Sequence, residues 1–288
     1  MESKNIIWLK DVDKNHLEVV GGKGANLGEM FKNFEIPNGF CITVDAYDKF
    51  LDHNKLKDLI VKELEGIDVE NTTELEKRAK NIRKAIEKSL IPKELITEKK
   101  EHYNKLKNKK VAVRSSATAE DLPNASFAGQ HDTYLNILGH DDFVDSVKKC
   151  WASLFTSRAI YYRDKNGFKH EDVKISVVVQ EMVEAKYAGV MFTIDPIFKK
   201  HILVEAVKGL GEKLVSGEVT PNTYFLDKKT FEVGQKNIMF DMDVEIIKKV
   251  AKEGEKVEAH YKQPMDVEWV INENDELKIV QARPITTL

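Results

Sequence analysis

A carboxylate and an amide near the end of the chain are the residues best placed to do chemistry. Residues 265–271 and 277–283 have the composition of two β-strands, and the polar residues 273–276 form a turn between them. Antiparallel pairing then puts Glu268 opposite Gln281, on one face and about 4.5–5.5 Å apart at Cβ. Oxygen ligands that converge in this way suit Mg²⁺. This ion prefers hard oxygen ligands, and protein side chains share its coordination with nucleotide phosphates.

The same register predicts further pairs around this point. Val270 faces Ile279, and Asp266 lies opposite Arg283, beside the two candidate ligands. The alternative is a half-exposed hairpin that turns its polar side chains to solvent, and spacing alone leaves both interpretations open.

A glycine-rich segment at residues 20–28 is a candidate phosphate cradle. It reads as a turn that runs into a helix, so backbone N–H groups could bind phosphate while Lys23 adds a positive charge. The segment matches neither the P-loop nor the dinucleotide-binding pattern, because Lys23 comes early and Ala25 follows Gly24. The alternative is an ordinary glycine turn with a solvated lysine.

Arg114 is a second candidate for binding phosphate. Residues 111–116 read as a strand, and an arginine followed by two serines at the strand end suits an anion. A guanidinium offers a planar set of charged donors to phosphate oxygens. The alternative is a structural ion pair with Glu120 or Asp121.

Two further segments could line the same site. In the loop 127–133, Gly129 could permit a close backbone approach and Thr133 could supply a hydroxyl. Residues 180–183 end an apolar strand, where a flat purine could read backbone N–H and C=O groups. The residues alone favour the plain alternative that this strand simply leaves the core.

The elements expected around these residues form an α+β protein, helix-rich in its first part and sheet-rich in its second. A boundary near Val183 divides the chain into lobes of residues 1–183 and 184–288. The Lys/Glu-rich segment 55–108 is expected to form a helical hairpin with solvated charged faces, and no chemistry is assigned to it.

Composition excludes several classes of protein. A formal net charge of −3 over 288 residues gives no indication of nucleic-acid binding, so any phosphate site is local. No window approaches the ~18 apolar residues of a membrane span, and the N-terminus lacks the apolar run of a signal peptide. Cys41 and Cys150 lack metal-ligand spacing, which is typical of reduced thiols in a cytoplasmic protein.

Several segments together resemble one enzyme family. They are residues 20–30, 111–130, 266–269 and 279–284. They resemble the N-terminal domain of phosphoenolpyruvate synthase (pyruvate, water dikinase), which pyruvate phosphate dikinase and rifampin phosphotransferase share. The resemblance covers nearly the whole chain and is most specific at 111–135. Segments 188–193 and 209–221 lean slightly toward the rifampin phosphotransferase branch.

The resemblance implies an ATP-grasp fold that binds Mg²⁺ and ATP between two lobes. It implies catalytic roles for Lys23, Arg114 and Arg283, all in contact with phosphate. The other implied contacts are Gly129 and Thr133 over the phosphates, Gln180, Glu181 and Val183 along the adenine, and Glu268 and Gln281 on Mg²⁺. Such a domain works by positioning and neutralising charge rather than by covalent help.

The same resemblance implies a partner. In this family ATP passes its βγ-diphosphate to a histidine on a separate swivelling domain, and AMP is a product. None of the eight histidines has the Gly-Gly-rich context of that residue. We therefore expect a truncated chain, one half of a split enzyme, or a stand-alone relative, with the final phosphoryl acceptor set elsewhere.

Three functions remain open from the sequence. The leading one is the ATP-binding part of a phosphoenolpyruvate synthase-like or rifampin phosphotransferase-like dikinase. The second is a non-catalytic nucleotide-binding module that regulates a partner. The third is an ATP-grasp ligase, which would release ADP rather than AMP.

Overall fold

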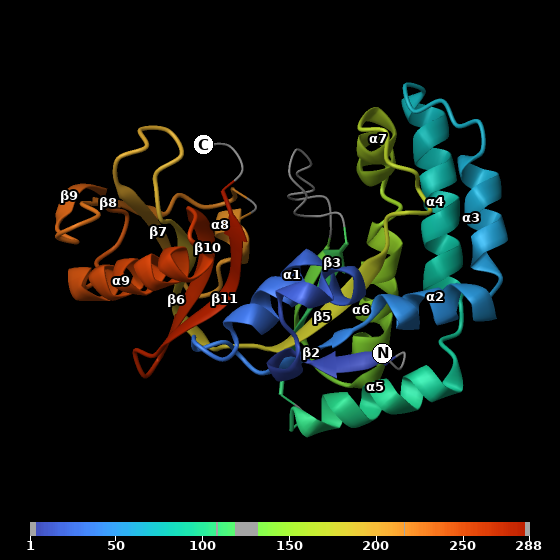
Figure 1. Ribbon diagram of the computed structural model, residues 1–288, viewed down its shortest axis with the longest axis horizontal. Helices are drawn as coiled ribbons and strands as arrows, with labels where there is room; N and C mark the ends of the chain where they lie inside the picture. The colour runs from blue at the N-terminus through green and yellow to red at the C-terminus, as the bar shows by residue number, and fades with distance from the viewer. Residues whose placement is uncertain (1–3, 108, 119–131, 216, 286–288) are drawn as a thin grey trace. The chain divides into compact units, whose positions relative to one another are not determined.

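The protein contains two compact units, each with its own antiparallel sheet. The computed structural model describes residues 4–107, 109–118, 132–215 and 217–285. Met1–Glu29 and Asn38–Met182 make up the first unit, and Met30–Pro37 and Val183–Leu288 make up the second. The mixed helix-and-sheet composition expected from the sequence is confirmed (Figure 1).

The first unit is built on a five-stranded sheet in the order β1-β2-β5-β3-β4. All neighbouring strands in it run antiparallel. The strands are β1 Ile6–Trp8, β2 Gly39–Ile42, β3 Val111–Ala117, β4 Thr133–Ile137 and β5 Ile175–Glu181. The central strands β3 and β5 are buried almost throughout, which fits their continuous runs of β-branched residues.

Helices cover both faces of this sheet. On one face, Val113 and Val179 join the main core with residues of α2 (Val44–His53) and α6 (His140–Ser153). On the other face lies α1 (Leu17–Met30), where a Cβ at Gly24 would come within 3.0 Å of the Cys41 sulfur. Short 3₁₀ turns at Leu9–Asp11 and Lys14–His16 lead into α1.

The segment expected to be a helical hairpin contains three helices instead. They are α3 Leu56–Leu64, α4 Thr72–Lys88 and α5 Lys93–Lys105. The helices α3 and α4 lie side by side in Figure 1, and the helical spacing of Leu75, Ala79, Ile82 and Ile86 makes one buried stripe on α4. The turn at Pro92 between α4 and α5 was expected, and the prediction missed a helix because it placed no turn at residues 65–71, between α3 and α4.

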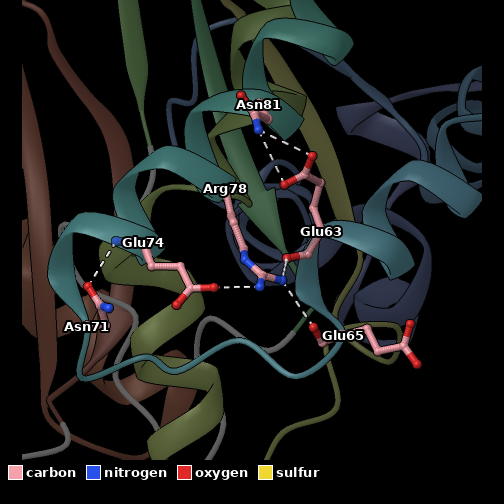
Figure 2. A network of polar contacts seen from close by, with 6 residues as sticks. All are labelled: Glu63, Glu65, Asn71, Glu74, Arg78 and Asn81. Atoms are coloured by element: carbon pink, nitrogen blue, oxygen red, sulfur yellow. Dashed lines mark hydrogen bonds and ion pairs between the residues drawn. The ribbon is translucent and has the colours of Figure 1, made fainter.

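A polar network ties α3 to α4 (Figure 2). Arg78 donates to the backbone carbonyls of Glu63 and Glu65 and pairs with the Glu74 carboxylate. Asn71 accepts from the Glu74 N–H at the start of α4, and Asn81 donates to the Glu63 carboxylate. The carbonyls at the end of α3 would otherwise lack helical partners, so Arg78 serves as a cap supplied by the next helix.

A buried arginine on α7 (Ser157–Lys165) donates a hydrogen bond to a neutral histidine. Arg163 is fully buried, and its Nε lies 3.1 Å from Nδ1 of His170, which accepts this hydrogen bond. Burial, and after it the charge of Arg163, lowers the pKa of His170 from 6.5 to about 4. A neutral imidazole is therefore the native form.

We predict that His170 contributes to the loss of stability in acid. The unfolded chain takes up a proton below pH 6.5 and the folded chain only near pH 4, so stability is lost as pH falls through this window. His170→Gln keeps an acceptor for Arg163 but cannot titrate. Its free energy of unfolding should drop less than that of the wild type between pH 7 and pH 5, measured by urea unfolding. Equal drops would contradict this prediction.

The second unit is built on a six-stranded antiparallel sheet in the order β11-β10-β6-β7-β8-β9. Its strands are β6 Ala185–Phe192, β7 Ile202–Lys208, β8 Asn222–Leu226, β9 Val233–Asn237, β10 Met265–Asn272 and β11 Leu277–Pro284. Its helices are the short α8 (Glu212–Val215) and α9 (Val244–Tyr261), which packs on β10, β6 and β7. Among the described residues, none of the helices is long and apolar enough to cross a membrane.

Candidate functional site

The hairpin β10–β11 brings together the carboxylate and amide predicted from the sequence. Glu268 is the register partner of Gln281, and Asp266 is the partner of Arg283. The pairs nearer the turn differ from the prediction, because Trp269 rather than Val270 faces Ile279. A β-bulge at Val280 restores the expected register beyond it.

A segment distant in the sequence supports this bulge. The backbone N–H of Ile279 donates to the carbonyl of Glu35 at 3.0 Å, and Lys278 forms an ion pair with the Glu35 carboxylate at 2.8 Å. Lys278 also lowers the pKa of that carboxyl. The outer edge of β11 is therefore occupied at the position where the strand departs from regular pairing.

Gln281 presents a carbonyl oxygen that nothing else in the described chain uses. Its side chain is 6% exposed, and its Oε1 has no hydrogen-bond partner among the described residues. A buried acceptor without a partner costs free energy unless a ligand satisfies it. Together with the half-buried Glu268 it forms a pair of hard oxygen ligands that fits Mg²⁺. Phosphate oxygens would complete the coordination, since no preformed cluster of three His, Cys, Asp or Glu side chains occurs in the part searched.

Arg283 is held on the same face by a buried carboxylate. Its Nε lies 2.9 Å and its Nη2 2.8 Å from Oδ2 of Asp266, which is 8% exposed. Burial raises the pKa of Asp266, and the charge of Arg283 opposes that rise. The pair orients a guanidinium beside Glu268, where it could contact an anion that the cation also binds.

The glycine-rich segment forms a break within α1 rather than a separate turn. Gly21 has φ 69° and ψ 176°, a conformation that is essentially restricted to glycine. Ser116 holds the break against β3, because its Oγ donates to Val20 O at 2.8 Å and accepts from Gly24 N at 3.1 Å. Ser176 donates to the same Val20 carbonyl at 2.6 Å. The helix thus restarts at Gly22, and the Gly24 amide is fixed against the sheet.

Arg114 lies on the sheet face that this helix covers. It does not end its strand as predicted, because β3 continues to Ala117. Arg114 is two residues before Ser116 and pairs across the sheet with Thr133, so all three share a face. The serines are structural rather than open to an anion, since Ser115 donates to Asp132 O. Glu120 and Asp121, the alternative ion-pair partners, lie outside the described residues.

Lys23 is the second residue after Gly21, and its side chain is half-buried. Its charge reaches the thiol of Cys150, whose Sγ lies 3.6 Å from Val113 O on β3. Burial raises the pKa of this thiol, Asp132 raises it further, and Lys23 opposes the rise. Two cationic side chains, Lys23 and Arg114, therefore belong to the same region of the first unit.

The predicted adenine contacts lie at the end of β5 and just after it. Gln180 is buried at 2% exposure, and its Nε2 has no hydrogen-bond partner among the described residues. The N–H groups of Glu181 and Met182 donate to Asn38 O and Lys110 O, so these two donors are unavailable to a base. Val183 begins the second unit, and Gly129 lies outside the described residues.

The structure thus gathers the predicted residues into two sets. Lys23, Arg114 and Thr133 belong to the first unit, and Glu268, Gln281 and Arg283 belong to the second. Sequence reasoning missed Ser176 and Glu35, which help to hold these sets in place, and it considered Ser116 for an anion rather than for its structural contacts. They carry no local signal, because their partners are distant in the chain.

These features belong to a class of nucleotide-binding domain. The chain matches the family described as "Pyruvate phosphate dikinase, AMP/ATP-binding domain" over residues 17–242 and 239–288. The protein is therefore a member of this family, and it is an ATP-binding domain.

Its curated relatives are similarly named. It is 45% identical over 315 residues to "Probable phosphoenolpyruvate synthase" of Archaeoglobus fulgidus, covering 98% of this chain and 42% of that one. It is 44% identical over 318 residues to the protein of the same name from Methanothermobacter thermautotrophicus (99% and 46%). It is 38% identical over 363 residues to "Phosphoenolpyruvate synthase" of Pyrococcus furiosus (100% and 44%). The chain spans less than half the length of these relatives, and they do not favour the rifampin phosphotransferase branch.

We predict that Gly21→Ala is much more destabilising than Gly66→Ala. Both glycines have positive φ, at 69° and 62°, so both variants lose roughly 1–3 kcal/mol from backbone strain. A Cβ at Gly21 would also lie 2.2 Å from Ser116 O, whereas a Cβ at Gly66 meets nothing within 4 Å. Overpacking should add a further ~1–3 kcal/mol. Urea unfolding measures the difference, and equal losses would mean that the Gly21–Ser116 approach is not constrained.

Proposed function

We propose that this chain is the ATP-grasp domain of a phosphoenolpyruvate synthase-like dikinase. It binds Mg·ATP with residues of both units and donates the βγ-diphosphate to a histidine of a phosphohistidine domain. Family membership supports the nucleotide, and the names of the relatives support the reaction. The free thiols of Cys41 and Cys150 fit the cytoplasmic location expected from the sequence.

The observation that carries this proposal is the polar end of the β10–β11 hairpin. Three side chains lie next to one another on one sheet face: Gln281, Glu268 and Arg283. Gln281 has a buried amide oxygen without a partner among the described residues, and Glu268 is its register partner. The guanidinium of Arg283 is held by Asp266. Glu268 and Gln281 would hold the cation, which neutralises phosphate charge when bound. Arg283, oriented by Asp266, would contact the phosphates next to it.

The first unit would supply the remaining positive charge. Arg114 and Lys23 would bind the phosphates, with Thr133 and Gly129 beside them. Because Arg114 is 7% exposed, its charge is screened less by water than that of a surface arginine. Gln180, Glu181 and Val183 would lie along the adenine.

The proposed transfer breaks the bond between the β-phosphorus and the oxygen that bridges it to the α-phosphorus, and it forms a bond from a histidine nitrogen to the β-phosphorus. AMP leaves with the bridging oxygen. In a ligase of this fold a substrate carboxylate would instead attack the γ-phosphorus, form an acyl phosphate and release ADP, so the nucleotide product distinguishes the two. A purely regulatory module would bind ATP and cleave nothing with any phosphohistidine partner.

We predict that Glu268→Ala and Gln281→Ala each weaken binding of Mg·ATP by at least roughly tenfold, since even indirect partners of a metal are worth 10–100-fold. Binding of adenosine without metal should hardly change. Calorimetry measures both ligands. Glu255→Ala and Gln235→Ala are matched controls, since both side chains are exposed on α9 and β9. Equal loss of adenosine binding would indicate misfolding rather than a cation site.

We predict that the chain alone turns over ATP slowly or not at all, and that adding a separately made phosphohistidine domain of this family yields AMP. Arg114→Ala should lower that rate by roughly 10³-fold or more, because positioned cations on a transferring phosphoryl group are worth this much. Chromatography of the nucleotides measures it, with Arg158→Ala on the exposed side of α7 as control. Steady AMP production without a partner would sink the prediction, and ADP would support the ligase.

A further inference from the structure

A loop of the second unit exposes two large apolar side chains in a fixed position. Between β6 and β7, Ile197 is 77% exposed and Phe198 is 62% exposed. Their backbone N–H groups donate to the carboxylate of the fully buried Asp195, at 2.9 Å and 3.2 Å. The N–H of Lys199 donates to the carbonyl of Asp195, and the N–H of Asp195 donates to the carbonyl of His201. The fold itself therefore holds the apolar pair outward.

Phe198 extends an apolar row on the sheet face opposite α9. Its ring centroid lies 6.4 Å from that of Phe225 on β8. Phe225 is the register partner of Leu203 on β7, and Leu203 is the partner of Phe192 on β6. These three side chains are half-buried, whereas the next residue, Met191, is 1% exposed and points to α9. We call Phe192, Ile197, Phe198, Leu203 and Phe225 together the apolar shelf.

The apolar shelf continues the row of side chains that carries Arg283. Phe192 is the register partner of Asp266 on β10, and Asp266 holds the Arg283 guanidinium. With strands about 4.8 Å apart, Arg283 lies about 10 Å from Phe192 and about 19 Å from Phe225 at their backbones. A protein interface of ordinary size covers about 800 Å² on each partner, which is a disc of roughly 16 Å radius. A protein that reaches a phosphate beside Arg283 therefore also covers much of the shelf.

The chemistry of the shelf defines the partner surface that fits it. Exposed apolar patches mark interaction sites, and a loop that is already ordered loses little entropy on binding. Lys199 and Lys200 directly follow the apolar pair and are exposed, so this edge of the shelf is basic. The complementary surface is apolar at its centre and acidic at its edge. This chain covers 42% and 46% of two of its curated relatives, so these relatives contain further protein that could supply such a surface.

We propose that the apolar shelf is the surface on which the domain with the acceptor histidine docks. The inference rests on the proposed function, which requires that histidine at the β-phosphorus, and it adds the place where the partner binds. Ile197 and Phe198 insert into an apolar patch of the partner, and Lys199 and Lys200 contact acidic side chains around that patch. Docking there brings the partner to the Arg283 end of the candidate site.

The test measures, by calorimetry, binding of a separately made phosphohistidine domain of this family to the chain. Mg²⁺ and α,β-methylene-ATP, which cannot be cleaved at that bridge, are present throughout. Phe198→Ser and Ile197→Ser should each weaken binding by roughly tenfold or more, as apolar anchors at the centre of an interface do. Leu90→Ser is the matched control, because Leu90 is 77% exposed on the turn between α4 and α5 of the first unit. It should bind as the wild type does.

The outcomes separate this inference from the proposed function. If the wild type binds the domain and Phe198→Ser does not weaken that binding, or if the wild type does not bind the domain, the docking surface is overturned. If the wild type binds the domain through the shelf but forms no AMP from ATP, the proposed function fails while the docking surface stands. The affinity of the chain alone for Mg·ATP should be the same in Phe198→Ser, and its loss would assign the shelf to the nucleotide.

Two other occupants of the shelf are tested with the chain alone. Sedimentation velocity measures self-association, and co-sedimentation measures binding to vesicles of phosphatidylglycerol and phosphatidylcholine. Neither should occur. Self-association or vesicle binding that Phe198→Ser abolishes would overturn the assignment to the phosphohistidine domain.

Discussion

The candidate cation site depends on one β-bulge in the edge strand β11. Near the turn, the hairpin runs in a register that would put Glu268 opposite Val280 and Gln281 opposite Val267 if it continued. Gln281 would then point to the α9 face, because a one-residue slip turns a side chain to the other side of the sheet. The extra residue Val280 prevents this, and the carbonyl of Glu35 accepts the Ile279 N–H beside it. Ligand geometry in the second unit is therefore a consequence of backbone pairing.

An equally local constraint organises the first unit. The backbone of Gly21 approaches β3 so closely that no side chain fits, and the hydroxyls of Ser116 and Ser176 both bind the Val20 carbonyl. This arrangement fixes the restart of α1 on the face that carries Arg114. Lys23 follows this restart directly in the helix, and no strong sequence motif marks the segment.

The sequence was sufficient for the pairings that depend on alternation and insufficient for those that depend on distant partners. Opposed placement of Glu268 and Gln281 followed from strand periodicity, although the intermediate pair Val270–Ile279 was wrong because bulges have no clear sequence signal. Arg114 was expected at a strand end, yet β3 continues beyond it through pairing with β5. The ion pair of Lys278 with Glu35 spans 243 residues of sequence, and no local pattern predicts such a contact.

The central claim is that the hairpin holds the cation of a bound nucleotide, and anomalous scattering from Mn²⁺ in crystals of the chain with ATP tests it most directly. The account predicts an anomalous peak within direct coordination distance of Gln281 Oε1 and the Glu268 carboxylate, in contact with phosphate oxygens. An ATP-bound crystal whose Mn²⁺ lies away from both side chains, or whose Gln281 points toward α9, would contradict it.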